Sequence, residues 1–165
     1  MTVRPWYLEA SAEISEDGMY RYGLLRRLTR GERTVLFVGL NPSTADAQTD
    51  DPTIRRCVGF ARLWGYDLML VGNIYAYRST NPNGLLGVED PVGPGNVAAL
   101  KSMIQKADRI VAAWGRHRLT CFAQTYAGWV LSLPTTGHLG RNKDGTPKHP
   151  LYLPSATKFS LANGC

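Results

Sequence analysis

The chain has 165 residues, 44% of them hydrophobic, and a formal net charge of +6 from 19 Lys and Arg against 13 Asp and Glu. A chain of this length can bury roughly 70% of its unfolded surface, so we expect one globular domain over residues 1–165. Its 17 Gly and 10 Pro follow no period, so neither a collagen-like repeat nor a disordered tract is indicated. The positive charge favours a polyanionic partner without naming one.

No apolar run approaches the roughly 20 residues needed to cross a bilayer, and the N-terminal segment has no apolar stretch of signal-peptide length. We therefore expect a cytoplasmic protein with no membrane partner. The three cysteines, Cys57, Cys121 and Cys165, lie far apart and show no CxxC or CxxH spacing. We expect reduced thiols without a chemical role, and no metal site.

In chain order, residues 1–30 are expected to form an N-terminal extension packed on the domain. Residues 34–39 (TVLFVG) predict a buried strand, because they form a continuous β-branched and aromatic run that ends in a turn signature, Gly39-Leu40-Asn41-Pro42. Residues 53–64 place apolar side chains near helical spacing, and Asp51-Pro52 ahead of them is typical of a helix start. A helix is therefore expected after the first loop.

The rest of the chain continues this alternation. Further strands are predicted at 68–75, 109–114 and 134–139, and further helices at 96–107 and 118–129. Strands that alternate with helices predict βαβ units and a parallel sheet covered on both faces. The expected fold is an α/β, three-layer α/β/α sandwich with a central, mostly parallel four-stranded sheet.

Ligands bind at the carboxyl ends of the strands in such folds, which here are the loops at 39–51, 73–83, 115–118 and 140–154. Gly39 lets the backbone approach closely and Pro42 fixes the turn, so Asn41 would be held rigidly where it can orient a water or a substrate edge. Asn73 lies in an otherwise apolar strand, and its amide can donate and accept at once, as a nucleobase edge requires. The alternatives are structural: Asn41-Pro42 as a turn cap, and Asn73 bonded to a neighbouring loop.

A histidine in the last loop is the third candidate. His149 is fixed by Pro150, and three basic residues lie in the same loop, Arg141, Lys143 and Lys148. A histidine in this setting can donate a hydrogen bond to developing negative charge, and basic neighbours suit phosphates. The alternative is a solvated charged loop. His117 and His138 are interpreted as surface or packing residues.

Two adjacent carboxylates, Asp50 and Asp51, precede the first predicted helix. Neighbouring residues do not face each other, so these are not the paired acids of a glycosidase. We expect Asp50 to pair with an arginine and Asp51 to cap the helix. The alternative is that Asp46 or Asp51 activates water.

Taken in order, these motifs resemble those of the uracil-DNA glycosylase superfamily. The resemblance lies in four places: Gly39-Leu40-Asn41-Pro42 as the water-activating loop, Asn73 as the base-reading amide, Ala113-Trp114-Gly115 before the fourth loop, and His149-Pro150 as the histidine motif. It implies a uracil-DNA-glycosylase-like fold and cleavage of the N-glycosidic bond of a base that is flipped out of a duplex or presented in a single strand.

The resemblance also implies residue roles. Asn41 would position a water, Asn73 would bind the base edge and His149 would stabilise charge on the departing base, without a cofactor. The substrate would be bound by the residues around these motifs, Gly39, Leu40, Pro42, Ser43, Asn73, Tyr75 and Asp51. Nucleic acid would be bound by Arg141, Lys143, Lys148 and Leu153, the last standing at the position of the family's apolar wedge.

Members specialised for uracil carry an aspartate and a bulky tyrosine around the first motif, where this chain has Asn41 and Ser43. The small Ser43 would admit a larger base. A nearly whole-length pattern is also similar to a bacterial and phage family catalogued as domain of unknown function 1643. Its segments are GLNPSTAD, DDPTIRRC, GNIYAYR, DPVGP, AAWG and KDGTPKHPLY.

Three functions therefore stay open. The first is a DNA glycosylase-like hydrolase that acts on a deaminated or modified base. The second is an enzyme on the same scaffold that processes a free nucleobase, nucleoside or nucleotide. In that case the carboxylates at 50–51 and the arginines at 55–56 would be additional site residues. The third is a non-catalytic module that binds nucleic acid or a protein partner.

Overall fold

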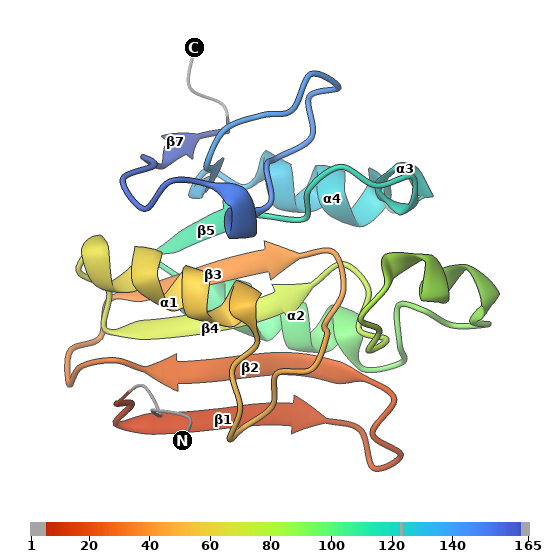
Figure 1. Cartoon of the computed structure of the whole chain (residues 1–165), viewed down its shortest axis with the longest axis horizontal. Helices are drawn as coiled ribbons and strands as arrows, with labels where there is room; N and C mark the ends of the chain where they lie inside the picture. Colours follow the sequence, from red (N-terminus) through yellow and green to blue (C-terminus); the bar gives the residue numbers. More distant parts are fainter. Residues whose placement is uncertain (1–5, 123, 163–165) are drawn as a thin grey trace.

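A seven-stranded mixed sheet runs through the computed structural model, which describes residues 6–122 and 124–162 (Figure 1). The strand order is β1-β2-β4-β3-β5-β6-β7. The strands are β1 (Glu9–Ile14), β2 (Arg21–Arg27), β3 (Thr34–Gly39), β4 (Leu68–Asn73), β5 (Arg109–Ala112), β6 (Thr136–His138) and β7 (Ser160–Leu161). The helices are α1 (Pro52–Leu63), α2 (Asn96–Lys106), α3 (Leu119–Phe122) and α4 (Gln124–Ser132), with 3₁₀ turns η1 (Pro82–Gly87) and η2 (Pro150–Tyr152).

The strands and helices predicted between residues 34 and 139 are confirmed, with ends shifted by up to three residues. The helix expected at 118–129 is instead two helices, α3 and α4. Strand β3 matches its predicted range, because five of its six residues are fully buried and its apolar run is unbroken.

The expected sheet of four strands was too small. Strands β4, β3, β5 and β6 are parallel neighbours, but β1, β2 and β7 add three antiparallel pairings at the two edges. Residues 9–27 are therefore a hairpin within the sheet and not an extension packed beside it. Their sequences, EASAEI and RYGLLRR, contain one β-branched residue, so they carry little strand signal of their own.

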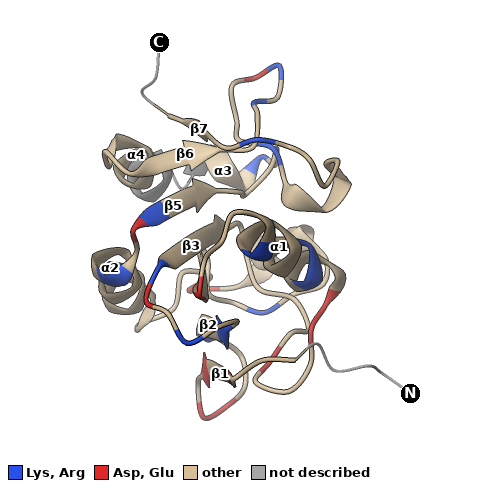
Figure 2. Cartoon of the chain, turned by 90° about the vertical axis from the view of Figure 1, so that its left-hand side faces the viewer, with Lys and Arg blue, Asp and Glu red and all other residues tan. Residues whose placement is uncertain are grey.

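Helices cover both faces of the sheet. Helix α1 lies on one face, and α2 and α4 lie on the other (Figure 2). Each face has its own apolar core: Val35 and Phe37 of β3 point toward α1, while Leu36 and Val38 point toward α2. The connection after β3 leads to α1 and the connection after β5 leads to α4, so neighbouring strands send the chain to opposite faces.

No helix within the described ranges is long and apolar enough to cross a membrane. Cys57 of α1 is buried and carries a free thiol, and burial raises the pKa of that thiol far above its usual range. Cys165 and the side chain of Cys121 lie outside what the structure describes.

Candidate functional site

A cavity of about 710 Å³ opens at the carboxyl ends of β3, β4 and β5, on the face of the sheet that α1 covers. Its sheet side is formed by residues that alternate along these strands, Phe37, Gly39, Val71, Asn73 and Ala113. The start of α1 and residues 148–153 line it as well. Because the chain leaves β3 and β5 toward opposite faces, the cavity lies where open α/β sheets bind ligands.

Asn73 occupies space that Gly39 leaves free. The two residues are register partners on β4 and β3, and a β-carbon on Gly39 would lie 2.8 Å from Asn73 Nδ2. Asn73 is buried and lines the cavity, yet its carboxamide has no hydrogen-bond partner among the described residues. The neighbouring loop is bonded by Asn96 instead, whose Nδ2 donates to the backbone oxygens of Asn73 (3.0 Å) and Ile74 (3.1 Å). Both the donor and the acceptor of Asn73 are therefore available to a ligand.

Asn41 is held in one orientation. Its Nδ2 donates to the backbone oxygens of Ser79 (2.9 Å) and Pro42 (3.1 Å). Backbone hydrogen bonds also tie this loop to the one after β4, since the N–H groups of Tyr75 and Ser79 donate to Leu40 and Pro42. The donor side of the Asn41 amide is thus engaged, and Oδ1 is left as the acceptor of a residue that lines the cavity.

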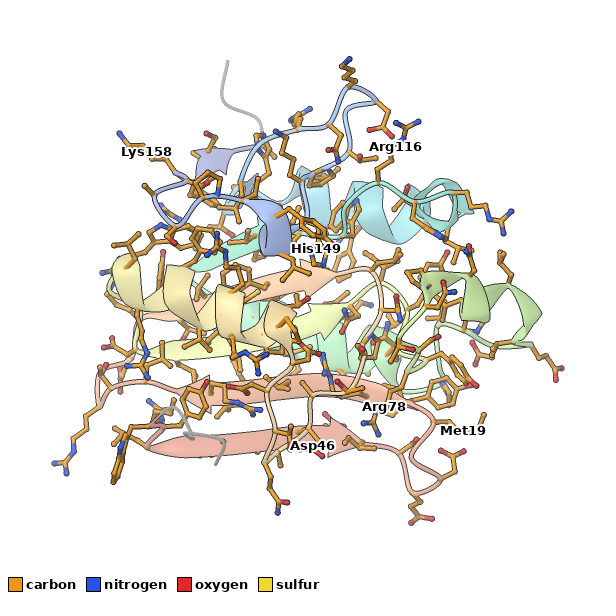
Figure 3. The ribbon with its side chains drawn as sticks, in the orientation of Figure 1. Met19, Asp46, Arg78, Arg116, His149 and Lys158 are labelled. Carbon is orange, nitrogen blue, oxygen red and sulfur yellow. The ribbon has the colours of Figure 1, made fainter. Side chains whose placement is uncertain are left out.

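His149 has a defined tautomer. The backbone N–H of Leu151 donates to His149 Nδ1 (3.2 Å), so the neutral imidazole carries its proton on Nε2. Burial lowers the pKa of His149, although the negative charge of Asp51 opposes this effect. Figure 3 shows His149 beside the start of η2, which packs against α1. Gly115, with φ +72°, permits this placement, because a β-carbon there would lie 3.2 Å from His149 Cβ.

The structure thus brings Asn41, Asn73 and His149 from three separate segments into the lining of one cavity. Six other expected site residues line it too: Gly39, Leu40, Pro42, Ser43, Lys148 and Leu153.

Two residues expected to bind substrate belong to the framework. Tyr75 does not line the cavity, because its buried hydroxyl donates to the backbone oxygen of Leu119 (2.8 Å). Asp51 is the N-cap of α1, where it accepts from the backbone N–H of Ile54 (2.9 Å). The capping role predicted for Asp51 is confirmed.

The arginine predicted to pair with Asp50 is Arg26 of β2. Arg26 Nη2 lies 2.9 Å from Asp50 Oδ1, and both side chains are almost fully buried. Tyr7 also donates to this carboxylate (2.5 Å). Asp50 therefore fixes the loop before α1 to the sheet.

Two of the expected nucleic-acid residues lie outside the cavity lining. Arg141 donates to the backbone oxygen of Ala162 (2.8 Å), and its Nε lies 3.1 Å from His138 Nε2, which places the start of the 140–148 loop against the C-terminal segment. Lys143 is exposed near the tip of that loop. Figure 2 shows basic residues along this loop.

The rim contains basic and aromatic residues of two loops that were predicted to bind ligands, although these residues were not themselves predicted to form the site. Arg116, labelled in Figure 3, lines the cavity. It forms an exposed ion pair with Asp144 (3.2 Å). His117 also lines it, with Nε2 3.2 Å from Asn83 Oδ1. Tyr152 is 86% exposed at the rim, whereas Leu153 packs partly against the core.

Arg21 is another cavity residue that sequence patterns missed, because β2 itself was not predicted. It is 2% exposed, and its Nη1 donates to the backbone oxygen of Ala45 (2.9 Å). Burial lowers its pKa to about 10, while the charge of Asp51 acts in the opposite direction. Arg21 therefore stays protonated at neutral pH.

The charge of the cavity is positive. Arg21, Arg116 and Lys148 line it, and no described Asp or Glu does. Among residues 6–122 and 124–162, no three His, Cys, Asp or Glu side chains are grouped so that they could hold a metal ion.

A family model described as "Protein of unknown function (DUF1643)" matches residues 21–151. The chain belongs to this family. The match begins at Arg21 and ends at Leu151, so it includes every residue that lines the cavity except Tyr152 and Leu153.

No curated protein and no solved structure matches the chain. The resemblance to uracil-DNA glycosylases therefore stays a prediction that depends on the motifs and on the geometry of the cavity.

Proposed function

We propose that this protein hydrolyses the N-glycosidic bond of a deaminated or modified base in DNA. The observation that carries the proposal is the shared cavity of Asn41, Asn73 and His149, in which two amides and one imidazole present groups that a flat heterocycle and an attacking water require. A block of four parallel strands with helices on both faces agrees with the glycosylase-like fold that the motifs imply.

Each residue has a role that follows from its bonding. Asn41 keeps Oδ1 as an acceptor, so it would bind a proton of the water that attacks the sugar carbon. Asn73 would pair with one donor and one acceptor on the base edge. His149 carries a proton on Nε2 and would donate it in a hydrogen bond to the base oxygen as negative charge builds there.

The rim suits a nucleic acid strand. Arg116 and Lys148 supply positive charge for phosphates, and the exposed ring of Tyr152 can stack on a base. Tyr152 replaces Leu153 in this proposal, because Leu153 packs on the core and is not free to enter a duplex.

The test is incubation with duplex and single-stranded oligonucleotides that carry uracil, hypoxanthine, xanthine or a hypermodified pyrimidine, with abasic sites as the readout. We expect product on at least one substrate and a loss of about 100-fold or more in rate for the Asn41→Ala and His149→Asn variants. His138→Asn is the matched control, because His138 Nδ1 also accepts from the backbone N–H two residues on but does not line the cavity. A folded protein that yields no abasic product on any of these substrates would exclude the proposal.

A second candidate is hydrolysis or transfer on a free nucleoside or nucleotide. The cavity of about 710 Å³ favours it, since there is room for a sugar and a phosphate beside the base. Thermal-shift measurements with nucleobases, nucleosides and nucleotides separate this candidate from the first, because only the first requires a strand.

A further inference from the structure

Arg21 reaches the cavity through an irregularity in the sheet. Glu13 pairs with Gly23, but the next residue, Ile14, pairs with Arg21, so Tyr22 is an extra residue on β2. Bulges of this kind redirect side chains. Arg21 and Leu24 consequently both lie on the α1 face although they are three positions apart, and Arg21 lines the cavity.

One edge of the Arg21 guanidinium has no protein partner. Nη1 donates to the backbone oxygen of Ala45. The buried Nε has no hydrogen-bond partner in the described part of the chain, and Nη2 forms no hydrogen bond with those residues either. A buried donor that stays unpaired is costly. Nε–H and Nη2–H form the side-on edge of a guanidinium, which binds two neighbouring acceptors at once.

The charge of Arg21 is already balanced nearby. The peptide of Ala45 accepts from Arg21 and donates its own N–H to Asp51 Oδ2 (3.4 Å), and Asp51 is buried. Almost none of the Nε surface is accessible, so a ligand pairs with this edge only when the Arg21 side chain shifts toward the cavity that it lines. Such a ligand needs two acceptor atoms but no negative charge of its own. Phe37, Val71 and Ala113 give the sheet side of the cavity an apolar surface for a planar ring.

We propose that Arg21 determines base specificity by binding the adjacent O6 and N7 acceptors of a 6-oxopurine, such as hypoxanthine, xanthine or guanine. This inference rests on the proposed function for the identity of the ligand as a base. Uracil and thymine have no such pair, because N3–H lies between O2 and O4, and adenine offers a donor in place of O6. Cytosine offers N3 and O2, so dependence on N7 is what distinguishes a purine from it. Arg21 thus selects a 6-oxopurine over uracil, thymine and adenine, while Asn73 contacts another part of the ring.

The experiment measures binding of inosine and 7-deazainosine by isothermal titration calorimetry, since 7-deazainosine lacks N7 but keeps O6. The same pair is then compared within single-stranded oligonucleotides, which separates a free nucleoside from a strand as the source of the base. We expect the wild type to prefer inosine by about tenfold to a hundredfold. Arg21→Lys keeps the charge but lacks the paired donors, so it should bind both ligands equally. Lys101→Met is the control, because it removes an exposed charge on α2 that does not line the cavity, and it should leave the preference unchanged.

Equal binding of inosine and 7-deazainosine by the wild type overturns the inference, and this comparison needs no variant to fold. An unchanged preference in a folded Arg21→Lys variant overturns it as well, and assigns Arg21 to supporting Ala45. Tighter binding of orotate or inorganic phosphate than of inosine, lost in the variant, identifies an anion site instead. Absence of binding by the nucleosides and the oligonucleotides alike also overturns it.

These outcomes are independent of the hydrolysis test. A preference for inosine without abasic product leaves the role of Arg21 intact and removes only the glycosylase. Abasic product without that preference removes only the role of Arg21.

Discussion

Gly39 and Asn73 end two neighbouring parallel strands, and the carboxamide of Asn73 lies where any side chain on Gly39 would have to begin. Gly39 does not have a positive φ. A glycine is therefore needed here because it leaves space for Asn73. The two motifs that contain these residues are therefore coupled by packing.

Gly39→Ala should lower the free energy of unfolding by about 1 kcal/mol or less and turn the Asn73 carboxamide away, because the new methyl group would lie 2.8 Å from Asn73 Nδ2 at the end of that side chain. In an Asn73→Ala background the same substitution should cost little, since its neighbour is gone. Urea denaturation of the four proteins in a double-mutant cycle measures this coupling. Additive effects would contradict it.

Asn73→Ala alone should change stability little, because the carboxamide forms no hydrogen bond within the described residues, while activity should be lost. Asn96→Ala is the matched control for a buried asparagine. It removes two hydrogen bonds to backbone oxygens and should cost about 1 to 3 kcal/mol. If Asn73→Ala proves as destabilising as Asn96→Ala, then Asn73 is a core partner and not a ligand-binding group.

His149→Asn should separate the structural role of His149 from its chemical one. Asparagine keeps an acceptor near the position of Nδ1, so the hydrogen bond from Leu151 N–H and the start of η2 should survive. It lacks Nε2–H, so the rate of base release should fall by about 100-fold or more while the melting temperature stays near that of the wild type. Full activity in this variant would remove His149 from the mechanism.

Acid should destabilise the protein in part through His149. Its folded pKa lies below the unfolded value because burial disfavours the charged ring. The unfolded chain therefore binds more protons below about pH 6.5, and the stabilising contribution present above that pH is lost as pH falls through the folded pKa. Urea denaturation at about pH 7.5 and about pH 5 should show a smaller loss of stability for His149→Asn than for the wild type. Equal losses would show that His149 titrates as it does in the unfolded chain.

The sequence predicted the centre of the sheet and missed its edges, for a physical reason. Strand β3 is buried on both faces, so its apolar run is visible without any partner. Strand β2 (RYGLLRR) contains three arginines and one glycine among its seven residues, so its sequence has no apolar run. It becomes a strand only by pairing with β4. Arg21 was missed with it, because a bulge on an unpredicted strand decides where that side chain points.

The position of the site was predictable from one rule, that ligands bind at the loops that follow the carboxyl ends of parallel strands. That rule placed residues 39–43, Asn73 and His149 at one end of the sheet, and they line one cavity. It could not separate residues that face the cavity from those that support it. Tyr75 follows Asn73 by two positions, yet its hydroxyl bonds to Leu119 because the chain has already left the strand.

Asp50 should matter for stability and not for chemistry. Asp50→Ala leaves the guanidinium of Arg26 buried without its carboxylate, and we expect a loss of about 3 to 5 kcal/mol in the free energy of unfolding. A double variant, Arg26→Met with Asp50→Leu, should recover much of this loss. Arg116→Met, which breaks an exposed ion pair and leaves the hydrogen bonds between Thr146 and Asp144 intact, is the control and should leave the melting temperature unchanged. A stable Asp50→Ala protein that has lost activity would return Asp50 to the candidate catalytic groups.

Tyr152 and Leu153 should respond in opposite ways to truncation. Tyr152 is 86% exposed at the cavity rim, so Tyr152→Ala should leave the melting temperature unchanged and weaken binding of a single-stranded oligonucleotide by about 1 to 3 kcal/mol, the worth of one stacked base. Leu153 packs against the core beneath α1, so Leu153→Ala should lower the free energy of unfolding by about 1 kcal/mol or more. Fluorescence anisotropy with a labelled oligonucleotide, combined with thermal denaturation, measures both effects. If Leu153→Ala weakens DNA binding without loss of stability, then Leu153 leaves the core to enter the nucleic acid, and the wedge position of the glycosylases applies to this chain after all.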